Sequence, residues 1–148
     1  ITLINRTCLL QLNAWVIPAC HIFYSREGQM TTKQTVLNYY SAIHAENWQD
    51  YISDKLAYGF NSAEQNLGKQ DYLQGAGNFF NSTTNVELAH LVVEGDKAAV
   101  IARYTAKSPA GDTQIFEVPE FLTVRDGKII ASSIYLDGAA FMAFIKGE

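Results

Sequence analysis

The chain has 148 residues, the length of one domain, and 48% of them are hydrophobic, which is enough to fill a core. The formal net charge is −4 and Lys and Arg are not clustered, which argues against a nucleic-acid partner and against an anionic membrane surface. Both cysteines, Cys8 and Cys20, lie among the first twenty residues. The rest of the chain therefore has no disulfide framework and no Cys-based zinc site, and we expect a cytoplasmic protein.

Residues 1–29 differ from the rest of the sequence. Their apolar stretch is broken by polar residues and by Pro18, and it is too short and too polar to span a membrane. The segment Ile17-Pro18-Ala19-Cys20 resembles a lipobox, so one interpretation is an export or lipid-anchoring signal. The interpretation we prefer is an extension outside the domain, with Met30 as the original start and the domain over 30–148.

Helical patterns occupy the first half of the domain. A capping box at Thr31 to Gln34, followed by apolar residues at helical spacing, predicts a helix over 32–45. A second helix is predicted from Asn47, with an apolar face that includes Trp48, Ile52 and Leu56, followed by a short extended piece around Phe60. A third helix is expected over 69–80.

The second half of the domain changes to the period of two that is typical of strands. Strands are predicted over 86–92, 98–106, 114–125 and 128–136, and they are separated by Gly- and Asp-containing turns, of which Asp126-Gly127 is a strong hairpin signal. A short helix is expected over 139–145. Helices followed by antiparallel strands predict an α+β domain with helices on one face of the sheet.

Several segments in this order resemble one known superfamily. They are residues 36–43, Asn47-Trp48, and residues 93–97, 121–130 and 135–137. Together they are similar to the nuclear transport factor 2-like superfamily, which includes ketosteroid isomerases, SnoaL-type polyketide cyclases, limonene epoxide hydrolases and scytalone dehydratases. The resemblance implies a curved antiparallel sheet wrapped around three N-terminal helices, a cone with a central pocket. It also implies a homodimer formed through the outer face of the sheet.

Glu120 is the most specific candidate for chemistry. If the strand over 116–124 is regular, Glu120 shares a face with apolar residues, where its charged form is disfavoured unless it is paired. In the resemblance it matches the buried acid of ketosteroid isomerases, which stays protonated and donates to the substrate oxygen. Two alternatives remain open: an ion pair with Arg103 or Lys107, or a bulge at Pro119 that turns the side chain to solvent.

Tyr39 matches the tyrosine that helps to form the oxyanion hole of ketosteroid isomerases, although it can equally be a core aromatic residue. The general base of those enzymes should lie near residues 60–63, but these positions hold Phe60-Asn61-Ser62-Ala63, and the nearest acid is Glu64. Asn and Ser cannot abstract a proton near neutral pH, so steroid isomerisation by that mechanism is doubtful.

Two further residues are candidates for proton transfer. Asp137 ends the last predicted strand and can act as a general base, or it can cap the helix that follows. His90 shares a face with Val86, Leu88 and Val92 if its strand is regular, and it is either a catalytic residue or a core or rim histidine. No His/Asp/Glu cluster has metal-ligand spacing, so neither metal nor cofactor is expected.

These observations predict a pocket for a small hydrophobic ligand. Its expected lining residues are Tyr39, Phe60, Phe79, Tyr104, Phe116, Val118 and Leu122. One hypothesis is a binding protein that catalyses nothing. The other is a cofactor-free isomerase, cyclase, dehydratase or hydrolase acting on a small carbonyl or polyketide-like substrate. The missing base favours the first hypothesis, and the isolated Glu120 favours the second.

Overall fold

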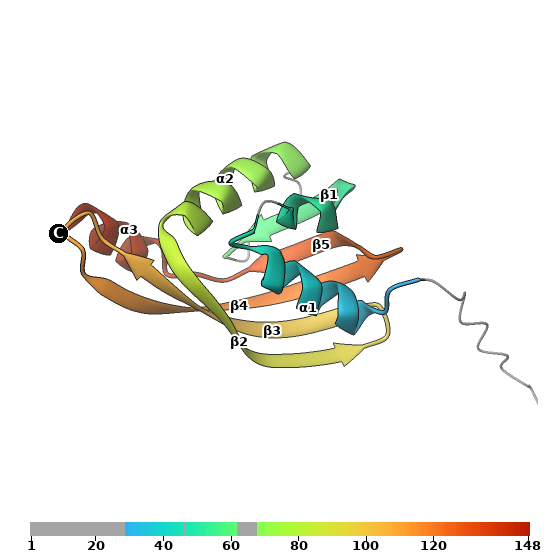
Figure 1. Ribbon diagram of the computed structural model, residues 1–148. Coiled ribbons are helices and arrows are strands. Elements are labelled where there is room, and N and C mark those ends of the chain that lie inside the picture. Colours follow the sequence, from blue (N-terminus) through green and yellow to red (C-terminus); the bar gives the residue numbers. More distant parts are fainter. Residues whose placement is uncertain (1–28, 46, 62–67) are drawn as a thin grey trace, which may run out of the picture.

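A computed structural model describes residues 29–45, 47–61 and 68–148 (Figure 1). Residues 1–28 of the predicted N-terminal extension, with Cys8 and Cys20, and the acid Glu64 lie outside the described residues. The described elements are α1 (Thr32–Ala42), the 3₁₀ turn η1 (Trp48–Tyr51), β1 (Ile52–Phe60), α2 (Lys69–Asn81), β2 (Thr83–Glu94), β3 (Lys97–Lys107), β4 (Thr113–Arg125), β5 (Lys128–Ile134) and α3 (Gly138–Lys146). None of the described helices is long and apolar enough to cross a membrane.

The five strands form one mixed sheet in the order β1-β5-β4-β3-β2. Strands β2 to β5 form the predicted antiparallel meander, whereas β1 pairs with β5 in parallel, so the expectation of a purely antiparallel sheet is corrected. Helices α1 and α2 lie over the same face of the curved sheet, and α3 lies at one end of it (Figure 1). The domain is therefore α+β, with two helices before the meander and one after it.

The predicted second helix is wrong beyond its first turn. Residues from Trp48 to Tyr51 form a single 3₁₀ turn, and Ile52–Phe60 is the strand β1. Ile52 and Leu56 are both buried. A spacing of four residues places two side chains on the same face of a helix and also on the same face of a strand, so this pattern could not separate the two structures. Pairing of β1 with β5 decides in favour of the strand.

The other predicted elements are confirmed with small changes in their ends. Thr31 and Gln34 form the capping box of α1, which ends at Ala42. The β4–β5 turn has φ of 52° at Asp126 and 70° at Gly127, as a two-residue hairpin loop of this kind requires. Positive φ at both central residues matches the right-handed twist of the strands that flank the turn.

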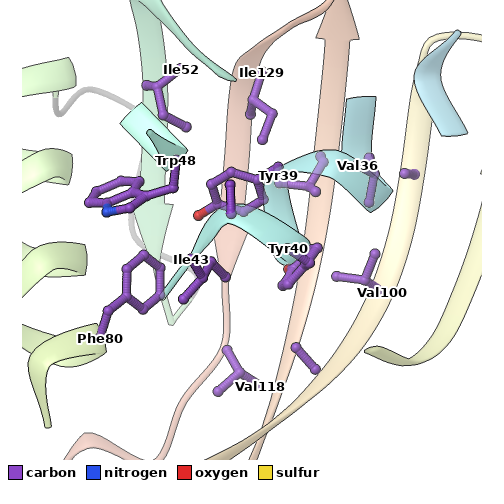
Figure 2. Close-up of a cluster of buried hydrophobic side chains, with 14 of the residues drawn as sticks. Val36, Tyr39, Tyr40, Ile43, Trp48, Ile52, Phe80, Val100, Val118 and Ile129 are labelled. Carbon is purple, nitrogen blue, oxygen red and sulfur yellow. The ribbon is translucent and has the colours of Figure 1, made fainter. Parts of the chain in front are cut away.

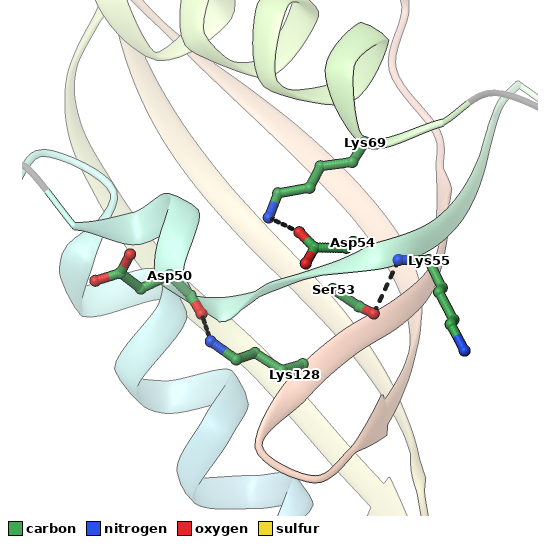
Figure 3. A network of polar contacts seen from close by, with 6 residues as sticks. All are labelled: Asp50, Ser53, Asp54, Lys55, Lys69 and Lys128. Atoms are coloured by element: carbon green, nitrogen blue, oxygen red, sulfur yellow. Dashed lines mark hydrogen bonds and ion pairs between the residues drawn. The ribbon is translucent and has the colours of Figure 1, made fainter.

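Polar contacts join the start of β1 to its neighbours (Figure 3). Lys69 of α2 forms an ion pair of 2.7 Å with Asp54, and the ammonium group of Lys128 in β5 donates to the backbone carbonyl of Asp50. The Asp54 side chain is 94% exposed, so the ion pair adds little stability. Packing and the β1–β5 pairing therefore provide most of what holds this strand.

The two faces of the sheet differ in exposure. The inner face carries buried residues such as Val100, Val118 and Ile129, which belong to one core cluster with residues of α1 and α2 (Figure 2). On the outer face the largest exposed hydrophobic residues of the strands are Val92, Ile115 and Phe121. The predicted homodimer would cover this face, and it stays a prediction.

Asn61 closes the end of β1 against the segment that follows β5. Its side chain donates to the carbonyl of Leu136 at 2.8 Å and accepts from the Leu136 backbone N–H at 2.9 Å. Its backbone N–H donates to the carbonyl of Ile134, and its φ of 49° is in the left-handed region. Asn suits this position because its side-chain amide can make both hydrogen bonds and because its backbone tolerates positive φ.

We expect Asn61→Ala to lower the free energy of unfolding by about 2 kcal/mol, because it removes two hydrogen bonds and forces Ala into positive φ. Asn61→Gly is the control, since it removes the same bonds without the backbone strain and should recover about 1 kcal/mol. Urea denaturation measures both. Equal stability of the Ala variant and the original protein would contradict this role.

Candidate functional site

A cavity of about 550 Å³ lies between the inner face of the sheet and the helices α2 and α3. Its size is in the range of small-molecule sites. Its walls are mainly apolar and aromatic: α2 supplies Tyr72, Ala76, Phe79 and Phe80, the strands supply Tyr58, Phe60, Tyr104, Val118, Ile134 and Glu120, and α3 supplies Phe141, Met142 and Ile145. The sequence led us to expect a hydrophobic pocket, and this cavity is the candidate for it.

Glu120 is the acid of this cavity, as the strand periodicity predicted. It pairs with Val100 of β3 and with Ile134 of β5, and its side chain is on the buried face, with only 4% of the residue exposed. Both alternatives for Glu120 are wrong. Arg103 forms its ion pair with Glu117, at 2.8 Å, and Lys107 pairs with Thr113, seven residues along β4 from Glu120. The β3–β4 register runs through Pro119 without a shift.

Pro119 is tolerated because of where β5 ends. Its carbonyl accepts from the Tyr135 N–H at 3.0 Å, on the side of β4 that faces β5. The last β4–β5 pair in this direction is Glu120 with Ile134, so the missing N–H of proline falls where that ladder stops. The strand therefore stays regular, and Glu120 stays on the inner face.

Burial without a counter-charge determines the electrostatics of Glu120. Desolvation raises the pKa of its carboxyl group from 4.5 to about 7, and the nearby hydroxyl of Tyr40 lowers it in part. The Tyr40 hydroxyl and Glu120 Oε2 nevertheless lack a hydrogen bond of normal geometry, so we regard Tyr40 as a polar neighbour and not as a firm partner. Near neutral pH the carboxyl group is divided between its acid and its anion.

Four tyrosines surround this acid from two helices and one strand. The hydroxyls of Tyr39 and Tyr72 are hydrogen-bonded to each other at 2.6 Å, whereas those of Tyr40 and Tyr104 have no partner. Burial raises the pKa of Tyr39, Tyr40 and Tyr104 well above 10, and it raises that of Tyr72 also. All four are neutral phenols at physiological pH, so Glu120 is the member of this group that changes charge.

The predicted oxyanion-hole residue Tyr39 does not line the cavity. It is 0% exposed and lies in the core cluster together with Val36, Ile43 and Trp48 (Figure 2). Its hydroxyl is hydrogen-bonded to the hydroxyl of Tyr72, and Tyr72 lines the cavity. The prediction that Tyr39 lines the pocket is therefore corrected, and Tyr72 lies at the cavity wall instead. The face formed by Tyr72, Ala76 and Phe79 on α2 was the sequence signal for it.

Of the other predicted lining residues, four lie at the cavity wall and two lie elsewhere in the core. Phe60, Phe79, Tyr104 and Val118 line the cavity as expected. Phe116 instead packs against Phe141 in a second cluster under α3, at 5.2 Å between ring centroids, and Leu122 is in the main core. The α3 contribution was missed, because the sequence gives no sign of where a C-terminal helix packs.

Neither Asp137 nor His90 reaches the cavity. Asp137 caps α3, and its carboxylate accepts from the Ala140 N–H at 2.9 Å. The β2–β3 register shifts between Leu88 and His90, so the alternation inverts at Ala89 and His90 points to the exposed face. Asp137 and His90 are therefore not placed for the catalytic roles predicted for them.

Within the described parts of the chain, no group of three His, Cys, Asp or Glu side chains is placed to hold a metal ion. At the position expected for a general base, Asn61 uses its side chain to bind Leu136. Among the described residues that line the cavity, Glu120 is thus the carboxyl group, and its chemistry is that of an acid that can donate a hydrogen bond or carry one negative charge.

The raised pKa of Glu120 predicts a specific pH dependence of stability. Between pH 4.5 and 7 the Glu120 carboxyl group holds a proton in the folded state that it has released in the unfolded state. The contribution of this proton to the free energy of unfolding is therefore fully present below pH 4.5 and is lost as the pH rises through 7. We expect Glu120→Gln to be more stable than the original protein at pH 8, by on the order of 3 kcal/mol, and to differ less at pH 4.

Denaturation curves of both proteins across this pH range measure the difference. Glu117→Gln is the matched control, because Glu117 lies on the same strand with an exposed side chain. That variant should follow the original protein. A constant difference between the Glu120→Gln variant and the original protein at all pH values would contradict a raised pKa.

Comparison with known proteins agrees with this architecture. The SnoaL-like domain model matches residues 36–132. No protein with curated functional information is similar enough in sequence to count as a match. Among solved structures, a protein from Jannaschia sp. CCS1, named as a SnoaL-like polyketide cyclase, superposes with a TM-score of 0.67 at 20% identity, covering 81% of this chain and 94% of that one.

Two further structures share the fold at lower identity. A protein from Rhodopseudomonas palustris, named as an isomerase, has a TM-score of 0.61 at 13% identity and covers 82% of this chain and 99% of its own. An NTF2-like protein of unknown function from Burkholderia pseudomallei K96243 has a TM-score of 0.62 at 13% identity and covers 77% and 96% of the two chains. The resemblance drawn from the sequence is confirmed: the chain belongs to the SnoaL-like domain family and has the nuclear transport factor 2-like fold.

Proposed function

We propose that this protein binds a small, mainly apolar molecule in the cavity and that the polar group of the ligand meets Glu120. The observation that carries the proposal is a buried carboxyl group, without a counter-charge among the described residues, at the wall of a cavity of about 550 Å³. Burial of an unpaired polar group costs stability, and a ligand that hydrogen-bonds to it would offset that cost.

The aromatic walls suit a ring-containing ligand. Phe79 and Tyr104 meet edge to face with ring centroids 4.9 Å apart, and Phe80 stacks on Tyr104 at 5.9 Å. Rings that hold one another in this way form a wall with few alternative rotamers, which lowers the cost of ordering it on binding. A flat or polycyclic body would bury the most apolar surface against it.

The second candidate function is a cofactor-free isomerase, cyclase, dehydratase or hydrolase acting on a carbonyl or polyketide-like substrate. The names of two structural neighbours, a polyketide cyclase and an isomerase, are consistent with it. The specific observation in its favour is the pKa of Glu120, about 7, because an acid with this pKa can give and take a proton at physiological pH. Glu120 would then transfer the proton without a second acid from Asp137 or His90.

A ligand screen with glycine variants of α2 tests the proposal. A Cβ at Gly75 or at Gly77 would meet no atom within 4 Å, yet only Gly75 lines the cavity, whereas Gly77 lines a separate polar groove. We expect a neutral aromatic ketone such as 2-acetylnaphthalene to raise the stability of the original protein, by about 2.7 kcal/mol at 100 times its dissociation constant. Gly75→Leu should weaken this effect and Gly77→Leu should keep it.

The outcomes separate the two functions. Equal stabilisation of both glycine variants would place the ligand outside the cavity and contradict the proposal. Exchange of the α-protons of the ketone in D2O, followed by NMR, tests catalysis. Faster exchange with the original protein than with Glu120→Gln supports an enzyme, and binding without any acceleration supports a binding protein.

A further inference from the structure

The charge distribution around the cavity is one-sided. Of the side chains that line it, all of them in the described part of the chain, none is Lys, Arg or His, and Glu120 is the one carboxyl group. The tyrosines that line it stay neutral because burial raises their pKa. The lining formed by the described residues therefore carries a charge of zero or −1 near neutral pH.

Two basic residues of the elements around the cavity are engaged elsewhere, and Lys146 at the end of α3 is exposed. Arg103 of β3 is on the outer face of the sheet with Glu117, at 2.8 Å, and Lys69 at the start of α2 pairs with Asp54, at 2.7 Å. A buried carboxylate needs a counter-charge, and in the described part of the chain none reaches Glu120. A bound molecule can supply that charge.

The lining favours a cation over an anion in two further ways. Aromatic rings attract cations through their negative faces, and the cavity has aromatic walls from Tyr72, Phe79 and Phe80. A carboxylate or phosphate ligand would find no positive charge among the described lining residues and would be repelled by ionised Glu120.

We propose that the cavity selects a lipophilic amine, a molecule with a ring-sized apolar body and one protonated nitrogen that lies beside Glu120. This inference rests on the proposed function, because it assigns the polar group of the ligand. A neutral oxygen can accept a hydrogen bond from protonated Glu120, but it leaves the ionised form without a counter-charge, whereas an ammonium group pairs with that form.

The affinity for an amine should depend on pH through Glu120. The titratable groups that face it are Tyr39 and Tyr40 from α1, Tyr72 from α2 and Tyr104 from β3. Its partners on β5 and β3, Ile134 and Val100, do not titrate. All four phenols stay neutral between pH 6 and 8, whereas Glu120 ionises in this range. The anion that pairs with an ammonium group is therefore scarce at pH 6 and abundant at pH 8.

Three probes with one apolar body test the inference: 2-naphthylmethylamine, 2-naphthylmethanol and 2-naphthoate. Calorimetric titration gives the dissociation constant of each at pH 6 and pH 8. We expect the amine, which is cationic at both values, to bind up to about tenfold more tightly at pH 8 than at pH 6, and the naphthoate to bind most weakly. The alcohol should bind no more tightly at pH 8 than at pH 6.

Glu120→Gln should remove both the pH dependence and the preference for the amine, and Glu117→Gln should keep them. An amine that binds no more tightly than the alcohol at pH 8 overturns the inference while leaving the proposed function intact. The same holds if the amine keeps its pH dependence in Glu120→Gln. If no probe binds the original protein at either pH, the proposed function itself fails.

Discussion

The burial of one unpaired carboxyl group on the inner face of β4 is the constraint on which the site depends. The register of β4 with β3 is continuous through Pro119, so Glu120 cannot turn to solvent without breaking the sheet. Burial moves its pKa to about 7, and the hydroxyls around it leave Oε2 without a hydrogen bond. A buried titratable group that lacks a protein partner, and that a ligand can pair with, is typical of functional sites.

The fold supplies the surroundings that give this group its properties. Helix α1 covers the sheet with Tyr39 and Tyr40, and α2 contributes Tyr72 and two phenylalanines to the cavity wall. The mixed sheet is closed on one side by β1, which Asn61 ties to Leu136. Water is thereby kept from most of the Glu120 side chain, and desolvation becomes the largest cause of its raised pKa.

The sequence predicted those features that depend on a regular local period. Alternation over 116–124 placed Glu120 inward because β4 is regular over this stretch, and the capping box gave the start of α1. Prediction failed where tertiary structure overrides the period. An extra residue at Ala89 turns His90 outward, and β1 could not be separated from a helix by a four-residue spacing. The part of α3 in the cavity wall depends on long-range packing that no local pattern encodes.

The most direct test of the account is the ionisation of Glu120 itself. In protein labelled with ¹³C at glutamate side-chain carboxyl groups, the Glu120 resonance is assigned by its loss in Glu120→Gln and followed by NMR across the pH range. We expect a midpoint near 7, well above the value of about 4.3 that is usual for a glutamate carboxyl group. A midpoint of about 4.5 for Glu120 would mean that the carboxyl group is solvated or paired, and it would contradict the central claim.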